Sequence, residues 1–252
     1  MPAPPYVAYT VLGGGLAILA AVLIGLHRAV ARTGWPPRQR AAVWRTGSVV
    51  LVAWFVAANA LGWLDFFRGA TSRIPTIEFG IFVPIIAGAI ALRRSGTLRR
   101  ILDATPQSWL VGVQLYRAMG VIFLTLFAAG KLPGAFALPA GIGDILVGIE
   151  APLVALMYAR GMPGRERLVR AWNLFGLLDL VVAVTTGFLT SPSPLQMLSP
   201  AAPNELIAAF PLVMIPVFAV PVAVLLHLAS LLKLRETPAH HTTPHGLAAS
   251  AA

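Results

Sequence analysis

Residues 137–159 read ALPAGIGDILVGIEAPLVALMYA, an apolar run that contains only two charged side chains, Asp144 and Glu150. A transmembrane helix needs about 20 consecutive, mostly apolar residues, because the hydrocarbon core of a bilayer is about 30 Å thick. The run therefore predicts a membrane-spanning helix with two carboxyl groups inside the bilayer.

Six further apolar runs occupy most of the remaining chain, and every connection between them is short. We therefore predict an all-α fold, a polytopic transmembrane bundle of about seven helices. The third run contains Pro84 and is the shortest, so a tilted or re-entrant segment is its alternative. The six runs are residues 6–30, 46–67, 77–92, 109–130, 169–189 and 206–232.

Composition supports a membrane protein. Of the 252 residues, 58% are hydrophobic and 11% are charged, whereas soluble domains have about 25% charged residues. Mean hydropathy is +0.80. The net charge of +10 comes from bases clustered between apolar runs, which is typical of topology signals and not of a nucleic-acid partner. The absence of cysteine excludes disulfides, cysteine-bound metal and thiol catalysis.

Lys and Arg residues predict the orientation. Fifteen of the 19 lie on alternate connections and in the segment after the last run, and three lie on the other connections. Because short cytoplasmic loops are enriched in Lys and Arg, we predict an outside N-terminus and a cytoplasmic C-terminus, in the plasma (cytoplasmic) membrane. The basic loops would contact anionic lipid headgroups.

Domain organisation is predicted to be simple. Residues 1–236 form one transmembrane domain, and residues 237–252, which have few large apolar side chains, form a disordered cytoplasmic tail. Residues 93–108 are expected to lie in the membrane interface as a basic amphipathic segment.

Ionisable groups within the apolar runs are the candidate functional residues, since each costs about 2.5–3.5 kcal/mol to insert. Counting about 1.5 Å per residue places three of them near the midplane and Asp144 nearer the outer surface. We expect Arg117 to pair with Glu150, Asp179 or both. The complete predicted polar cluster is Gln114, Arg117, Asp144, Glu150, Asn173 and Asp179.

The charges of this cluster do not balance, because one base meets three acids. Either some carboxyl groups stay protonated or a cation binds there. A static ion pair beside neutral acids is the structural alternative. The segments Gly141-x-x-Asp144 and Gly176-x-x-Asp179 resemble each other, which is compatible with an inverted repeat or with chance.

Two other features suggest a site. Pro211, Pro216 and Pro221 interrupt the last run, and broken helices line binding sites in many transporters, although proline is also common in ordinary transmembrane helices. His27 and His227 lie near the cytoplasmic ends of the first and last runs. They could ligate haem iron or a metal, or simply anchor helix ends. No cofactor is required by the sequence.

Three functional hypotheses remain, since no metalloprotease, nucleotide-binding or serine-hydrolase motif is present. We favour a small-solute or proton-linked transporter that uses the polar cluster. The second hypothesis is a membrane-embedded enzyme or b-type haem protein. The third is a non-catalytic subunit or sensor, in a homo-oligomer or a membrane complex.

Overall fold

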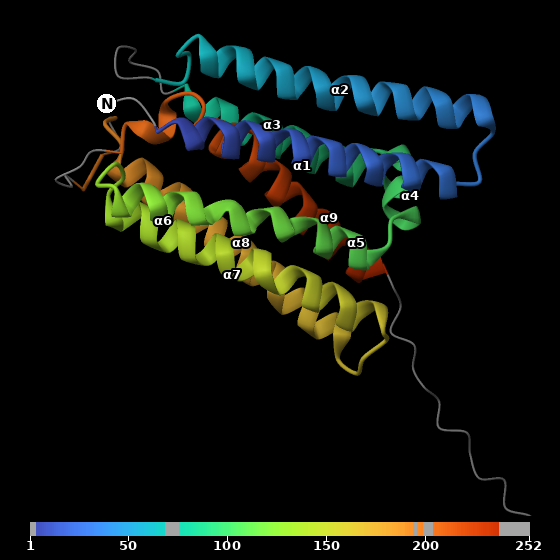
Figure 1. Cartoon of the computed structure of the whole chain (residues 1–252). Coiled ribbons are helices and arrows are strands. Elements are labelled where there is room, and N and C mark those ends of the chain that lie inside the picture. The colour runs from blue at the N-terminus through green and yellow to red at the C-terminus, as the bar shows by residue number, and fades with distance from the viewer. Residues whose placement is uncertain (1–3, 69–75, 194–195, 199–203, 237–252) are drawn as a thin grey trace, which may run out of the picture.

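The computed structural model describes residues 4–68, 76–193, 196–198 and 204–236, and this part of the chain is helical and contains no strand (Figure 1). Six helices are long and apolar enough to cross a membrane, so the predicted all-α architecture of an integral membrane protein is supported. They are α1 (Pro5–Arg32), α2 (Pro37–Trp63), a span of three consecutive segments (Gln107–Ala128), α7 (Gly134–Ala159), α8 (Arg165–Thr190) and a span ending in α9 (Ile215–Arg235).

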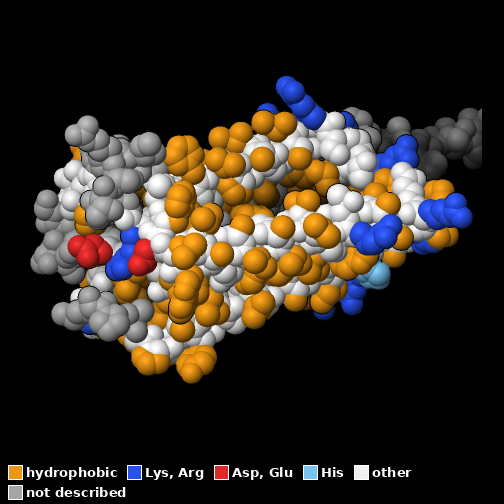
Figure 2. All heavy atoms as spheres, turned by 90° about the horizontal axis from the view of Figure 1, so that it is seen from above, with side chains coloured by type: hydrophobic (Ala, Val, Ile, Leu, Met, Phe, Trp, Pro, Cys, Tyr) orange, Lys and Arg blue, Asp and Glu red, His pale blue; other side chains and the backbone are white. Residues whose placement is uncertain are grey.

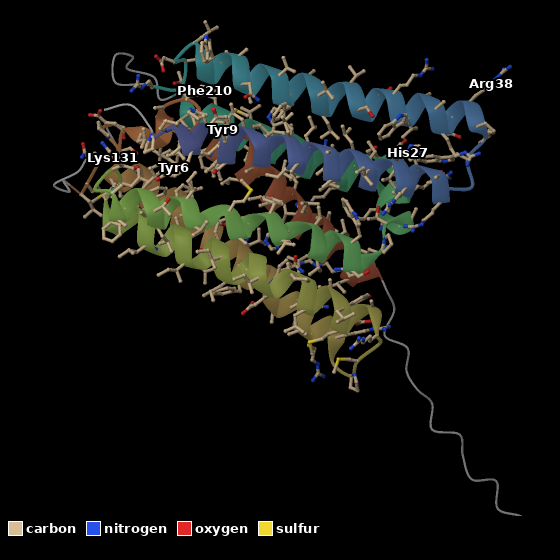
Figure 3. All side chains as sticks on the ribbon, in the orientation of Figure 1. Tyr6, Tyr9, His27, Arg38, Lys131 and Phe210 are labelled. Carbon is tan, nitrogen blue, oxygen red and sulfur yellow. The ribbon has the colours of Figure 1, made fainter. Side chains whose placement is uncertain are left out.

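The long helices lie side by side and give the molecule two ends (Figure 1). Tyr6, Tyr9 and Lys131 lie toward one end, which we call the N-terminal end (Figure 3). His27 and Arg38 lie toward the other, which we call the basic end (Figure 3). Lys and Arg side chains gather at the basic end, and apolar side chains cover the middle (Figure 2). This distribution suits a bundle whose middle faces hydrocarbon.

The span of Ile215–Arg235 forms the centre of the bundle. It begins with a π-helical turn, η4 (Ile215–Ala219), and continues as α9 (Val220–Glu236). Together these segments contact α1, α2, α3, α5 and α8. Over the most apolar stretch of this span 56% of the residues are buried, against 6% over the corresponding stretch of α2. The helix α2 packs mainly on α1 and leaves the rest of its apolar surface exposed.

The third predicted run forms α3 (Ile77–Arg94), which is a helix of 18 residues. It packs against α9 and η4. It is not one of the six long apolar helices, because it is short and carries charge at both ends, at Glu78, Arg93 and Arg94.

The predicted start of the seventh helix, at residue 206 of the run 206–232, is wrong. Only Leu206–Ala208 is helical there, as a single 3₁₀ turn, and the long span starts at Ile215. Two prolines, Pro211 and Pro216, explain the delay, because proline cannot donate a backbone hydrogen bond and clashes with the preceding turn.

The predicted amphipathic segment contains α4 (Gly96–Ala104). Its apolar side chains Ile101 and Leu102 are buried, whereas its arginines are exposed. Lys233 of α9 donates hydrogen bonds to the carbonyl oxygens of Leu102 (3.0 Å) and Asp103 (2.8 Å), at the end of α4. The predicted tail, residues 237–252, lies outside the described residues.

Candidate functional site: a buried charge cluster below a cavity

The span that carries Arg117 is not a continuous α-helix. Between α5 (Gln107–Gly112) and α6 (Val121–Ala128), the chain forms a 3₁₀ helix of eight residues, η2 (Val113–Gly120). Such long 3₁₀ stretches are uncommon within helices and often mark functional hinges. Side chains three residues apart eclipse in this geometry, so Gln114 and Arg117 share one face, and both are buried.

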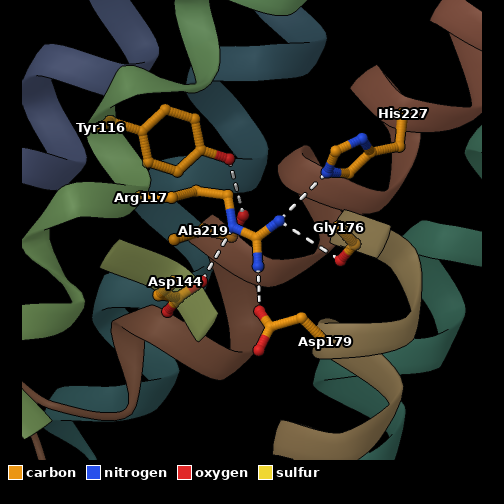
Figure 4. A network of polar contacts seen from close by, with 7 residues as sticks. All are labelled: Tyr116, Arg117, Asp144, Gly176, Asp179, Ala219 and His227. Carbon is orange, nitrogen blue, oxygen red and sulfur yellow. Dashed lines mark hydrogen bonds and ion pairs between the residues drawn. The ribbon is translucent and has the colours of Figure 1, made fainter. Parts of the chain in front are cut away.

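Arg117 lies at the centre of a charge cluster formed by three other helices (Figure 4). Its Nε donates to Asp144 Oδ1 of α7 at 2.8 Å, and its Nη2 donates to Asp179 Oδ2 of α8. Its Nη1 donates to the carbonyl oxygen of Gly176 at 3.3 Å and lies 3.0 Å from His227 Nε2 of α9. One guanidinium therefore joins its own span to three others.

His227 continues the network toward the basic end. A guanidinium nitrogen can only donate, so His227 Nε2 accepts and its Nδ1 carries the proton. That Nδ1 donates to Asn173 Oδ1 at 2.8 Å. Asn173 Nδ2 donates to Ser230 Oγ at 2.8 Å, and Gln107 Nε2 donates to the same oxygen. A buried chain of hydrogen bonds thus runs from Arg117 to the first residue of α5.

Two glycines leave room for the cluster. A Cβ atom on Gly143 would collide with the carboxyl group of Asp179, and one on Gly176 would collide with the imidazole of His227. The two Gly-x-x-Asp segments thus meet at one place, because both of their aspartates bind the Arg117 guanidinium.

A second irregular segment faces η2. The hydroxyl of Tyr116 donates to the carbonyl oxygen of Ala219 at 3.2 Å, and Ala219 ends the π-helical turn η4. Pro216 lies within this turn, and such turns occur frequently at functional sites. The cluster is therefore bordered by two non-α segments, one 3₁₀ and one π.

A cavity of about 470 Å³ lies between the cluster and the N-terminal end. Glu78, Glu205, Phe136 and Leu180 are among the residues that line it, and Asp144 reaches it from the cluster. The Asp144 side chain is 15% exposed, compared with 2% for Arg117. A smaller cavity of about 40 Å³ also borders Asp144 and extends to Arg117 and Tyr116. The cluster is thus approached from the N-terminal end.

Of the two partners expected for Arg117, the structure pairs Asp179 with it and places Glu150 away from it. Glu150 is exposed on α7 and makes no ion pair within the described residues. It lies six residues after Asp144, and at about 100° per residue this turns it well away from the Asp144 face. Asp144, which we expected nearer the outer surface, binds Arg117 instead.

The other predicted residues have different surroundings. Asn173 belongs to the hydrogen-bond chain. Gln114 is fully buried, and its amide makes no hydrogen bond to any described residue. His27 is exposed and packs against Trp44 of α2, with ring centroids 5.0 Å apart. His27 and His227 therefore lie in separate environments, and His227 directs its free lone pair at Arg117.

Sequence reasoning missed four members of the network. Gln107, Tyr116 and Ser230 are uncharged, and His227 was considered as a haem or metal ligand or a helix-end anchor, not as a partner of Arg117. A spacing signal was present, since His227 and Ser230 lie three residues apart, as do Asn173 and Gly176. Polar and small residues at this spacing share a helix face and mark helix–helix contacts.

Comparison with known proteins gives one result. A family model described as "Domain of unknown function (DUF8737)" matches residues 74–235, which is more than half of the chain and includes every member of the network. No curated protein and no solved structure matches the chain. The chain belongs to the DUF8737 family.

Proposed function

We propose that this protein is a small proton-linked transporter of the cytoplasmic membrane. The observation that carries the proposal is the cavity of about 470 Å³ that ends on Asp144, which is ion-paired to the buried Arg117. Ionisable residues inside a bilayer are costly and usually mark substrate or proton pathways. A cavity that reaches such residues from one end gives a solute access to them.

The proposed topology has seven spans: the six long apolar helices and, in addition, α3, which is third along the chain. Its 18 residues would extend about 27 Å as an α-helix, close to the thickness of the hydrocarbon core. The Arg-rich basic end then faces the cytoplasm and its anionic lipids. The N-terminal end, and with it the cavity, faces outward.

The charge count of the cluster supports proton linkage. Because Glu150 is not part of the cluster, one guanidinium faces two carboxyl groups, those of Asp144 and Asp179. Full ionisation leaves one excess negative charge in a low-dielectric environment, which is unfavourable. One proton or one cationic group removes that excess. Competition between the two for the same carboxylates would couple solute movement to proton movement.

The irregular segments beside the cluster supply the movable parts. The η2 and η4 segments both border the smaller cavity, through Tyr116, Arg117 and Ala219. Non-helical backbone at membrane depth is tolerated where it lines a cavity, and discontinuous helices surround the sites of many secondary transporters. A change in the backbone of either segment would alter the shape of this smaller cavity beside Asp144.

The proposal is tested by proton flux in proteoliposomes that contain a pH-sensitive dye, with solutes added one class at a time. We expect at least one class to drive proton movement with the parent protein. The Asp179→Asn variant should abolish it. The Glu150→Gln variant is the matched control, because it removes an exposed carboxyl group from the same bundle, and it should retain full flux.

Other outcomes would support other functions. If no solute class moves protons with the folded parent protein, transport is excluded, and the cluster acts as a structural tie within a subunit or sensor. A haem function is disfavoured by the donor set, because His227 Nε2 accepts a hydrogen bond from Arg117 and has no lone pair left for iron. A Soret band in the purified protein would reverse that conclusion.

A further inference from the structure

Among the described residues that line the cavity, acidic side chains outnumber basic ones. The acids are Asp65, Glu78, Asp144 and Glu205, and the base among the described lining residues is Arg68. Arg68 forms an ion pair with Asp65 at 3.6 Å, so these two charges neutralise each other. Asp144 shares the single Arg117 with Asp179, and Glu78 and Glu205 add two further carboxyl groups. The described residues at the cavity therefore carry an excess of negative charge, which favours a cation and repels an anion.

The wall of the cavity is apolar and partly aromatic. Four phenylalanines line it, and most other wall residues are aliphatic. The faces of aromatic rings attract organic cations, and the attraction strengthens when the cation is desolvated. Such a wall accommodates the apolar body of a ligand as well as its charged group. The four are Phe67, Phe123, Phe136 and Phe188.

The floor of the cavity offers a carboxylate oxygen. Asp144 uses Oδ1 to accept the hydrogen bond from Arg117 Nε, and its Oδ2 accepts none from the described residues. Arg117 itself is engaged by Asp144, Asp179, Gly176 and His227. An ammonium group that enters the cavity therefore finds an open acceptor, whereas a carboxylate finds the guanidinium already occupied.

We propose that the cavity binds an organic monocation, an amine or quaternary ammonium with an apolar and preferably aromatic body. Its charged group lies at Asp144, and its body lies among the phenylalanines. A volume of about 470 Å³ is within the usual range for small-molecule sites, about 300–1,000 Å³. This inference rests on the proposed transport function and names the class of its substrate.

Three probes of one size test the charge preference: 2-phenylethylammonium, 2-phenylethanol and phenylacetate. Binding is measured by isothermal titration calorimetry on the full chain in lipid nanodiscs. We expect the ammonium to bind at least tenfold more tightly than the alcohol and the carboxylate to bind most weakly. Equal affinities for ammonium and alcohol, or tighter binding of phenylacetate, would overturn the proposal.

Asp144→Asn locates the site. The variant should lower the affinity for the ammonium at least tenfold and leave that for the alcohol unchanged. Glu150→Gln, on the same helix, should leave both unchanged. If Asp144→Asn does not fold, Glu78→Gln and Glu205→Gln replace it. Each should weaken ammonium binding about two- to fivefold, as expected for a partly exposed charge pair, and no change in either would contradict the site.

The two proposals fail separately. Ammonium binding that depends on Asp144, without any solute-driven proton flux, keeps the cation site and excludes transport. Proton flux driven only by neutral or anionic solutes keeps transport and excludes the cation site. A co-purified lipid that blocks the cavity and is not displaced by the ammonium would also exclude the cation site.

Discussion

The two halves of the bundle interior differ, although the same helices build both. From Arg117 toward the N-terminal end, the interior contains a cavity of about 470 Å³. Toward the basic end, it is filled by a cluster of buried residues such as Val111, Val147 and Trp172, and by the hydrogen-bond chain that ends at Gln107. The difference gives the charge cluster two unlike sides, one hollow and one packed, and predicts that the halves respond differently to substitution.

The largest effect is expected where the two halves meet. Replacing Arg117 with Leu leaves Asp144 and Asp179 buried without their shared partner, and breaking a buried ion pair in this way costs about 3–5 kcal/mol. We expect the free energy of unfolding, measured by steric trapping in bicelles, to fall by that amount. Arg117→Lys should recover only part of it, because an ammonium cannot contact both carboxylates in the guanidinium's planar geometry. If Arg117→Leu unfolds with the same free energy as the parent protein, the charge cluster does not stabilise the fold.

A matched pair of substitutions compares the halves directly. Ala151 is fully buried in the packed half, and Ala183 lines the cavity. Ala151→Leu should destabilise the protein by about 1–3 kcal/mol through overpacking. Ala183→Leu should change the unfolding free energy by less than about 0.5 kcal/mol, since the added methyl groups enter open space. Equal costs at both positions, measured by the same method, would contradict the contrast.

Ser230→Ala tests the hydrogen-bond chain of the packed half. The substitution removes the acceptor shared by Asn173 and Gln107. Both amides keep another acceptor, Val169 O and Ser230 O respectively, so we expect a loss of only about 1 kcal/mol. Thermal unfolding in nanodiscs measures it, with Thr186→Ala as control, because the Thr186 hydroxyl donates to carbonyl oxygens of its own helix, α8. If Thr186→Ala lowers the stability and Ser230→Ala does not, the hydrogen-bond chain does not stabilise the packed half.

The smallest effect is expected from Tyr116→Phe. It deletes the 3.2 Å hydrogen bond between η2 and η4 and leaves the ring in place. A neutral hydrogen bond of this length is worth about 0.5 kcal/mol. We expect nearly unchanged stability but a changed transport rate, if the two irregular segments move against each other. Unchanged stability together with an unchanged rate would show that the contact has no role in movement.

The sequence was sufficient for most of the fold. Apolar run length is a property of the chain alone, so the long helices lie where they were predicted. The exceptions depend on local chemistry. Charge at both ends shortens the apolar part of α3, and Pro211 and Pro216 delay the last span until Ile215.

The site was only partly predictable, because the rise per residue along a helix gives the depth of a side chain in the membrane but not the helix face on which it lies. Depth counting placed Glu150 near the midplane and missed that it faces away. The small residues Gly141, Gly148 and Ala151 share a face with Asp144 by their three- and four-residue spacing, and that spacing could have distinguished the two acids. The cavity was not predictable, since it arises from how α3, α7 and α8 stand relative to the last span.

The 3₁₀ helix η2 has a consequence for how the protein could change shape. A 3₁₀ helix rises about 2.0 Å and turns about 120° per residue, against about 1.5 Å and 100° for an α-helix. Rewinding its eight residues into α-helix would shorten the span by about 4 Å. It would also swing Arg117 through about 80° relative to Val113. A winding change of that kind would carry the guanidinium off its aspartates without any rigid-body rocking, and spin labels on α5 and α6 would register the shortening.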